Sequence, residues 1–210
     1  MEFAIVGWPG DGATLRLDYR TFAYAGKFAV GDPGKAVVRT GTGTSAAPEW
    51  EPERSLPETL DPDAFDDDVI AAVSFSPDRT DAARCRLRYV AVHVARRGEG
   101  IAPELIARLL PRLDEAGYDR VRIAVNNPFA YEALYKIGFA YTGDRTGLAE
   151  LELARPADRP APTHDDGDRY RAGLDRFMTR DPDRSAHEFL RSRLRAGPPR
   201  RPDDTSDGHL

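Results

Sequence analysis

The stretch between residues 85 and 139 decides the fold, and its sequence is CRLRYVAVHVARRGEGIAPELIARLLPRLDEAGYDRVRIAVNNPFAYEALYKIGF. It begins with arginines that alternate with apolar residues and then becomes apolar as far as Val94, as expected for a central strand. A turn that contains Gly98 and Gly100 follows. Residues 101–113 then place apolar side chains at the spacing of an amphipathic helix. This half of the stretch therefore predicts a strand, a glycine-rich turn and a helix.

The second half of the stretch predicts another strand and another helix. Gly117 ends the first helix, and residues 119–125 alternate as a strand with one apolar face. Asn127 is a preferred N-cap and Pro128 a preferred first helical residue, so a second helix is expected to begin there. Gly138 ends that helix.

The glycine-rich turn has the chemistry of an anion site. The first N–H groups of a helix lack intrahelical acceptors, and the helix dipole adds positive charge there. Gly98 and Gly100 allow a ligand close to the backbone, and Arg96 and Arg97 offer charge-assisted bonds to a phosphate. A tight turn with surface arginines is the alternative. The turn is not a Walker loop, because no Gly-Lys-Ser/Thr follows, and it lacks the third glycine of a dinucleotide-binding fingerprint.

Outside this stretch the chain predicts several short elements. Strands are expected at residues 2–8, 35–40, 68–76, 139–142 and 149–154. The aromatic-rich residues 15–28 fit one or two short helices, with a strand as the alternative. Beyond Arg155 prolines interrupt the chain, and the pattern predicts helices at residues 168–178 and 184–195 and disorder from Gly197 to Leu210.

Negative charge is concentrated in one segment of this chain of 210 residues, whose formal net charge is -5. Residues 41–68 hold one base, Arg54, and nine acids, namely Glu49, Glu51, Glu53, Glu58, Asp61, Asp63, Asp66, Asp67 and Asp68. Four prolines divide the segment, so residues 41–67 are expected to form a long surface loop, called the acidic loop below. The sequence shows no basic face or tail, which argues against a nucleic-acid partner.

Composition limits other classes of protein as well. The apolar runs are too short to span a bilayer, and the N-terminus lacks the basic and apolar regions of a secretory signal. Cys85 is the single cysteine, so we expect neither an internal disulfide nor a zinc site built on several thiolates, and no metal. A cytoplasmic location is the expectation for such a chain.

Two motifs in the decisive stretch resemble those of one enzyme superfamily. Residues 97–102, Arg-Gly-Glu-Gly-Ile-Ala, match the Arg/Gln-x-x-Gly-x-Gly/Ala signature of the GNAT superfamily of N-acetyltransferases. Residues 127–130, Asn-Pro-Phe-Ala, and residues 134–139, Leu-Tyr-Lys-Ile-Gly-Phe, are similar to that superfamily's Asn-x-x-Ala and Tyr-x-x-x-Gly-Phe segment. The resemblance covers residues 1–154 in order of elements and about 85–142 in motif.

The resemblance implies an α+β fold of three layers. Its central sheet would be mixed but mostly antiparallel, flanked by helices, and splayed open between the strands at 85–94 and 119–126, where acetyl-CoA would sit. Residues 1–154 would form the acyltransferase domain, and residues 155–210 a C-terminal extension with two short helices and a disordered end.

The resemblance also implies the residues that would hold acetyl-CoA. Its pyrophosphate would lie on backbone N–H groups of the glycine-rich turn, and its pantetheine arm would pair with the strand before the turn as an added strand does. A backbone N–H near that strand end would stabilise the tetrahedral oxyanion. The residues implied are Val90, Ala91, Val92, Arg97, Gly98, Glu99, Gly100, Ile101, Ala102 and Asn127.

Tyr135 is the catalytic residue implied by the second motif, as the general acid that protonates the departing thiolate. An amphipathic core tyrosine with its hydroxyl at the surface is the alternative. Asn127 lies one residue earlier than the usual asparagine, and Arg122 stands where many relatives keep a glutamate that deprotonates the amine. The general base is therefore unassigned. His93, Asp78 and Asp81 are candidates, as is a relay through water, but a structural histidine and solvated loop aspartates are the more ordinary roles.

The expected activity is transfer of the acetyl group of acetyl-CoA to a primary amine, on a small molecule or a peptide, by direct attack in a ternary complex. A non-catalytic acyl-CoA-binding sensor or interaction subunit is the alternative, and a nucleotide-binding domain fits the motif order poorly. Residues 15–28, the hairpin after Tyr141 and the acidic loop would build the acceptor pocket, with Tyr19, Phe22 and Tyr24 as candidate walls. An acidic loop at its mouth would favour cationic amines, and a solvated linker is the other interpretation. The sequence leaves the oligomeric state open, with a homodimer as one option.

Overall fold

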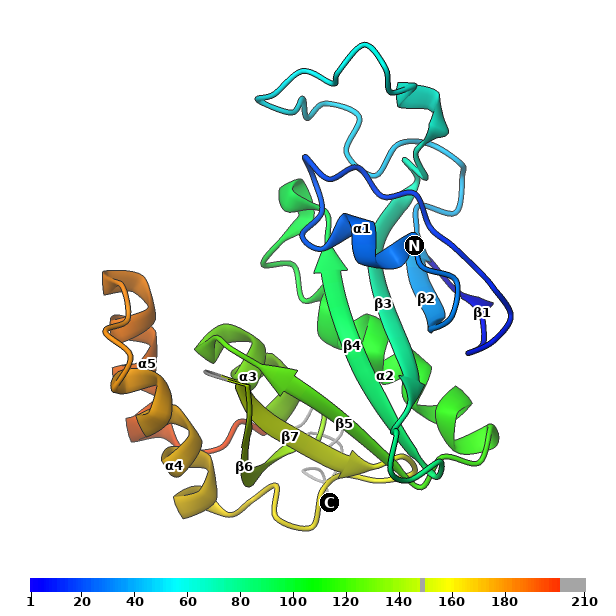
Figure 1. Ribbon diagram of the computed structural model, residues 1–210. Coiled ribbons are helices and arrows are strands. Elements are labelled where there is room, and N and C mark those ends of the chain that lie inside the picture. Colours follow the sequence, from blue (N-terminus) through cyan, green and yellow to red (C-terminus); the bar gives the residue numbers. More distant parts are fainter. Residues whose placement is uncertain (148–149, 201–210) are drawn as a thin grey trace, which may run out of the picture. The chain divides into compact units, whose positions relative to one another are not determined.

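The computed structural model describes residues 1–147 and 150–200, and Figure 1 shows their arrangement into elements. The strands of this described part are β1 (Glu2–Gly7), β2 (Gly34–Arg39), β3 (Val69–Pro77), β4 (Arg84–Val92), β5 (Arg120–Val125), β6 (Ala140–Thr146) and β7 (Glu150–Pro156). The helices are α1 (Ala25–Phe28), α2 (Ile101–Glu115), α3 (Pro128–Tyr135), α4 (Gly167–Met178) and α5 (Arg184–Ala196), with short 3-10 turns η1 (Pro62–Ala64) and η2 (Val94–Arg96). The predicted disordered end lies, from residue 201 onward, outside the described residues.

Hydrogen bonds join the strands in the order β1-β2-β3-β4-β5-β7-β6. The pairs β1–β2, β2–β3, β5–β7 and β6–β7 are antiparallel. The predicted α+β fold with a mostly antiparallel sheet is therefore confirmed. The opening expected between β4 and β5 stays a prediction.

Contacts divide the chain into two compact units. Unit 1 consists of Met1–Ala82 and Arg86–Arg112, and unit 2 of Ala83–Cys85 and the chain from Leu113 onward. The domain boundary expected after residue 154 stays a prediction.

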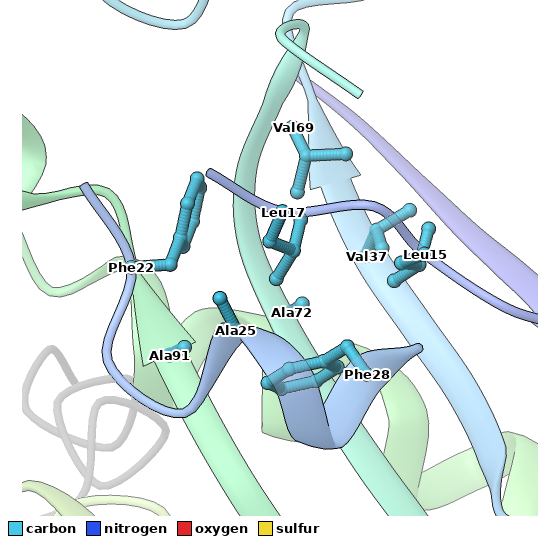
Figure 2. Packing of buried hydrophobic residues seen from close by; sticks show 9 residues of the cluster. All are labelled: Leu15, Leu17, Phe22, Ala25, Phe28, Val37, Val69, Ala72 and Ala91. Atoms are coloured by element: carbon cyan, nitrogen blue, oxygen red, sulfur yellow. The ribbon is translucent and has the colours of Figure 1, made fainter. Parts of the chain in front are cut away.

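The core of unit 1 forms where residues 15–28 cover one face of β2, β3 and β4. Leu15 and Leu17 are buried on alternate positions of a segment without regular structure. Of the one or two short helices expected within residues 15–28, one forms, the four-residue α1. Figure 2 shows the two leucine side chains directed toward the strands. The packed residues are Leu15, Leu17, Phe22, Ala25, Phe28, Val37, Val69, Ala72 and Ala91.

A buried lysine ties this covering segment to the sheet. Lys35 of β2 has no exposed surface, and its Nζ donates to the carbonyls of Ala13 (2.6 Å), Val30 (2.6 Å) and Pro33 (2.9 Å). Burial lowers the pKa of this ammonium group. One buried side chain therefore joins three carbonyls on either side of the covering segment.

The α2 helix follows the predicted periodicity closely. The large apolar residues on which the prediction rests are all buried, and they are Ile101, Leu105, Ile106, Leu109, Leu110 and Leu113. Gly117 has a φ of 88°, the left-handed backbone of a helix C-terminus. The turn, the helix and the helix end are therefore confirmed.

In unit 2, α4 contacts α5 and β6, and α3 contacts α5 and β5. Both helices expected beyond Arg155 are confirmed to within one residue. The strand predicted at residues 139–142 is shorter than the observed one, because β6 continues to Thr146 through a register shift after Tyr141. Gly143 lies in this bulge with a φ of 98°, so a glycine permits the strand to continue.

Candidate functional site

The glycine-rich turn presents a row of backbone donors at the start of α2. Gly98 and Gly100 have φ angles of 84° and 78°, in the left-handed region that favours glycine. Within the described residues, no protein acceptor faces the backbone N–H groups of residues 98–102, and Glu104 makes the first helical bond, to the carbonyl of Gly100 at 3.2 Å. A Cβ at either glycine would meet nothing within 4 Å, so the space beside the turn is open. This arrangement suits an anion such as a pyrophosphate.

The two arginines of the turn differ in their contacts. Arg96 donates from Nε to Glu99 at 2.8 Å and from Nη1 to the carbonyl of Ala46 at 3.2 Å. The hydrogen bond from Arg96 lowers the pKa of the Glu99 carboxyl. Arg97 is exposed and has no ion-pair partner among the described residues. Arg96 therefore neutralises Glu99 and holds the acidic loop, whereas Arg97 remains available to a phosphate.

His93 follows the predicted cofactor strand directly and continues its ladder, donating from its backbone N–H to Ile70 at 2.9 Å. Its side chain is 8% exposed, and Nδ1 accepts a hydrogen bond from the Ala95 N–H at 3.3 Å. Burial lowers the pKa of His93, and the neighbouring Arg96 guanidinium lowers it further. The neutral ring therefore carries its proton on Nε2 and offers a donor, so His93 is poorly suited to the role of general base.

In unit 2, Asn127 and Pro128 begin α3 as predicted. The Asn127 side-chain oxygen accepts a hydrogen bond from the Ala130 N–H at 2.8 Å, which confirms the cap. Its expected contact with coenzyme A stays a prediction.

Tyr135 lies at the end of α3 and is fully buried in an aromatic cluster. Its Oη accepts a hydrogen bond from the Tyr141 N–H at 2.9 Å and lies 3.3 Å from the hydroxyl of Tyr131. Burial raises the pKa of Tyr135, so the phenol keeps its proton at neutral pH. Tyr135 therefore packs in the core, but its hydroxyl is buried and not at the surface as the alternative expected. Its role as general acid stays a prediction.

A buried acid missed by sequence reasoning lies beside Arg122. Glu152 of β7 is paired in register with Ala124 of β5, and therefore shares a face with Arg122. The Arg122 guanidinium contacts the Glu152 carboxylate at 2.6 Å, and the glutamate is 4% exposed. Among the loop candidates for a base, Asp78 accepts hydrogen bonds from Thr80 within a turn. The register of two strands far apart in the chain, which no local pattern indicates, brings the acid to this position.

Residues 18–22, the acidic loop and His93 enclose a cavity of about 180 Å³ in unit 1, called the loop cavity below. Phe22 lines it, as expected of an acceptor pocket, while Tyr19 lines a neighbouring groove of about 550 Å³. Tyr24, the third candidate, is exposed and stacks on Tyr89 instead. A larger groove of about 1030 Å³ runs along β1 and contains none of the predicted site residues.

Two further features bear on the class of site. Among residues 1–147 and 150–200, no group of three or more His, Cys, Asp or Glu side chains is placed to hold a metal ion. No helix in that described part combines the length and apolar character needed to cross a membrane.

Comparison with known proteins finds similarity to acetyltransferases. Residues 42–139 match the acetyltransferase (GNAT) family model. No curated protein matches the sequence. Among solved structures, an N-acetyltransferase from Staphylococcus aureus Mu50 is 15% identical with a TM-score of 0.42, over 60% of this chain and 68% of that chain.

Two other solved structures are similar at the same level. A GNAT superfamily phosphinothricin acetyltransferase from Sinorhizobium meliloti, in complex with AcCoA, is 16% identical with a TM-score of 0.40, over 59% of this chain and 60% of its own. An IAA acetyltransferase from Bacillus cereus ATCC 14579 is 15% identical with a TM-score of 0.39, over 59% of this chain and 77% of its own.

Proposed function

Because residues 42–139 match the acetyltransferase (GNAT) family model, we propose that the chain transfers the acetyl group of acetyl-CoA to a primary amine. The amine nitrogen attacks the thioester carbonyl carbon in a ternary complex, a C–N bond forms and the C–S bond breaks. The nitrogen loses one proton, the sulfur gains one, and the products are an acetamide and coenzyme A.

One observation carries this proposal, namely the row of backbone N–H groups at residues 98–102 that lack acceptors within the described part of the chain. These donors and the helix dipole favour the pyrophosphate of acetyl-CoA, and Arg97 adds a charge-assisted bond. Backbone groups of residues 90–92 would pair with the pantetheine arm, and Asn127 would contact coenzyme A. Bound acetyl-CoA supplies the activated thioester that the amine attacks.

Tyr135 is the proposed general acid, and the state of its hydroxyl supports this role. Burial raises the pKa of the phenol above its ordinary value, so the hydroxyl holds its proton more firmly than an exposed tyrosine does. It accepts hydrogen bonds from the Tyr141 N–H at 2.9 Å and from the Tyr131 hydroxyl at 3.3 Å, so neither contact uses its own proton. A phenol whose proton is not committed to a backbone carbonyl can protonate a departing thiolate. The Val92 region of β4 would stabilise the oxyanion through a backbone N–H.

Calorimetric titration with acetyl-CoA, beside coenzyme A, ATP and NAD, tests the cofactor. Thermal unfolding with and without each ligand gives a second readout, because a ligand at a hundred times its dissociation constant stabilises the fold by about 2.7 kcal/mol. Arg97→Gln should weaken acetyl-CoA binding about tenfold, because one charge-assisted bond is lost. Arg79→Gln, on an exposed loop of the same unit, is the matched control and should change nothing. No binding of acetyl-CoA at high concentration would overturn the proposal.

A non-catalytic acyl-CoA-binding protein is the second candidate, and Arg122 favours it. Where many relatives place a carboxylate, this chain has a guanidinium that is already paired with Glu152. Tyr135→Phe separates the two functions, because it should abolish release of coenzyme A by an enzyme and leave acetyl-CoA binding intact. The variant also loses an acceptor for the Tyr141 N–H, so its folding is checked by circular dichroism before activity is compared.

A further inference from the structure

The loop cavity is built from three segments of unit 1 that are distant in the sequence. Its lining residues come from residues 18–22, from the acidic loop and from the end of β4. His93 is the residue that closes it at the strand, and it directly follows Val92, which the proposed function places beside the acyl group. The cavity therefore lies next to the part of unit 1 where an acceptor has to bind.

The acidic loop is held in place around this cavity. The Arg96 guanidinium donates to the carbonyl of Ala46 at 3.2 Å, and the Ala46 N–H donates to the carbonyl of Asp67 at 2.8 Å. The Arg20 guanidinium donates to the carbonyl of Arg54 at 3.1 Å. These contacts join the loop both to the glycine-rich turn and to the segment at residues 18–22, which a solvated linker would not do.

His93 offers a hydrogen-bond donor to the cavity. The rings of Phe22 and Trp50 meet it edge-on, each with centroids 5.4 Å away, and they fix the orientation of the imidazole. Its Nδ1 is used by the Ala95 N–H, and its Nε2 has no hydrogen-bond partner within unit 1. A donor without a protein partner at the wall of a cavity can bind an ordered water or the lone pair of a neutral amine nitrogen.

The carboxylates around the cavity differ in how far they are neutralised. Asp18 pairs with Arg20 at 2.6 Å, and Asp66 accepts the backbone N–H of Arg16 at 2.7 Å. The side chain of Asp67 is exposed and has no cationic partner among the described residues. This carboxylate is therefore available to a ligand, and the indole of Trp50, which also lines the cavity, can add a cation–π contact.

We propose that the loop cavity binds the acceptor amine and that this acceptor is a small diamine or polyamine. The inference rests on the proposed function, since it names the substrate class of the same site. One amine nitrogen would face the end of β4, and the second, cationic nitrogen would lie near Asp67 and Trp50. The neighbouring groove of about 550 Å³ shares Arg20 and Trp50 with the cavity and includes Glu51 and Glu53, so longer polyamines have room to extend.

Fluorescence of Trp50 tests this inference without any need for turnover. The chain has two tryptophans, so Trp8→Phe leaves Trp50 as the single reporter. Titration with 1,4-diaminobutane, with and without coenzyme A, should give a saturable change in emission. Glutamate, an amine with net negative charge, should give none.

Two aspartates of the acidic loop provide the matched pair of variants. Asp67→Asn should weaken diamine binding about threefold to fivefold, because it removes an exposed charge near the ligand. Asp63→Asn removes the same charge from an exposed position that does not line the cavity, and should leave binding unchanged. Equal weakening by both variants, or no effect of either, would overturn the inference.

Failure of this inference is distinguishable from failure of the proposed function. Acetyl-CoA binding is measured on the same samples. A protein that binds acetyl-CoA but shows no saturable diamine signal, or that responds equally to glutamate, retains the proposed function and loses this substrate class. Calorimetry with 1,4-diaminobutane on the wild-type chain gives a second readout that does not depend on the Trp8→Phe variant.

Discussion

Gly173→Ala should destabilise the protein, although alanine is normally the better helix former. Gly173 is an interior residue of α4 with an ordinary helical backbone, where this substitution usually stabilises by about 1 kcal/mol. Here a Cβ would lie 2.1 Å from Oη and 2.5 Å from Cζ of Tyr131 on α3. The two helices approach so closely at this point that only a hydrogen fits.

The cost follows from how firmly Tyr131 is held. Its ring is fully buried, and its hydroxyl lies 3.1 Å from the Tyr170 carbonyl. The rings of Tyr135 and Phe177 pack against it with centroids 4.9 Å and 5.7 Å away. Overpacking of about 1–3 kcal/mol and loss of one hydrogen bond of about 1 kcal/mol outweigh the helix gain, leaving a net loss of about 1–3 kcal/mol.

Urea unfolding monitored by circular dichroism measures this free-energy difference. Gly26→Ala is the control, because a Cβ there meets nothing within 4 Å, and its stability should stay within about 1 kcal/mol of wild type. In a Tyr131→Phe background the closest contact is absent, so the penalty of Gly173→Ala should shrink. A Gly173→Ala variant as stable as wild type would refute the close packing of α4 on α3.

Three further outcomes are expected. Lys35→Met should lower the unfolding free energy by about 2–4 kcal/mol, because three hydrogen bonds from one charged donor are lost; a loss below about 1 kcal/mol in urea unfolding would contradict this. Burial raises the pKa values of Tyr131, Tyr135 and Tyr170, so the unfolded chain releases their protons first; the contribution of these tyrosines to stability should be constant up to about pH 10 and fall above it, which thermal unfolding of the wild type and of Tyr131→Phe against pH would show. Gly98→Ala should cost about 1 kcal/mol through its left-handed backbone and weaken acetyl-CoA binding, and calorimetry with unchanged affinity would argue against the turn as the cofactor site.

Short-range patterns in the sequence predicted the elements that carry the candidate cofactor site. The apolar spacing of α2, the cap formed by Asn127 and the turn glycines each depend on interactions within one or two helical turns. Such interactions are encoded in neighbouring residues, so the order of elements and the family resemblance follow from the sequence alone. The lengths of α1 and β6 do not, because packing on the sheet and a bulge decide them.

The sequence by itself therefore determined the α+β class, the glycine-rich turn before α2 and the motif that contains Tyr135. Only the tertiary structure showed that Lys35 donates to three carbonyls, that Glu152 lies beside Arg122, and that His93 and the acidic loop line one cavity. The physical reason is the separation of the partners along the chain. Register, burial and cavity walls arise from contacts between residues tens of positions apart, and no local pattern records which distant segment will supply the partner.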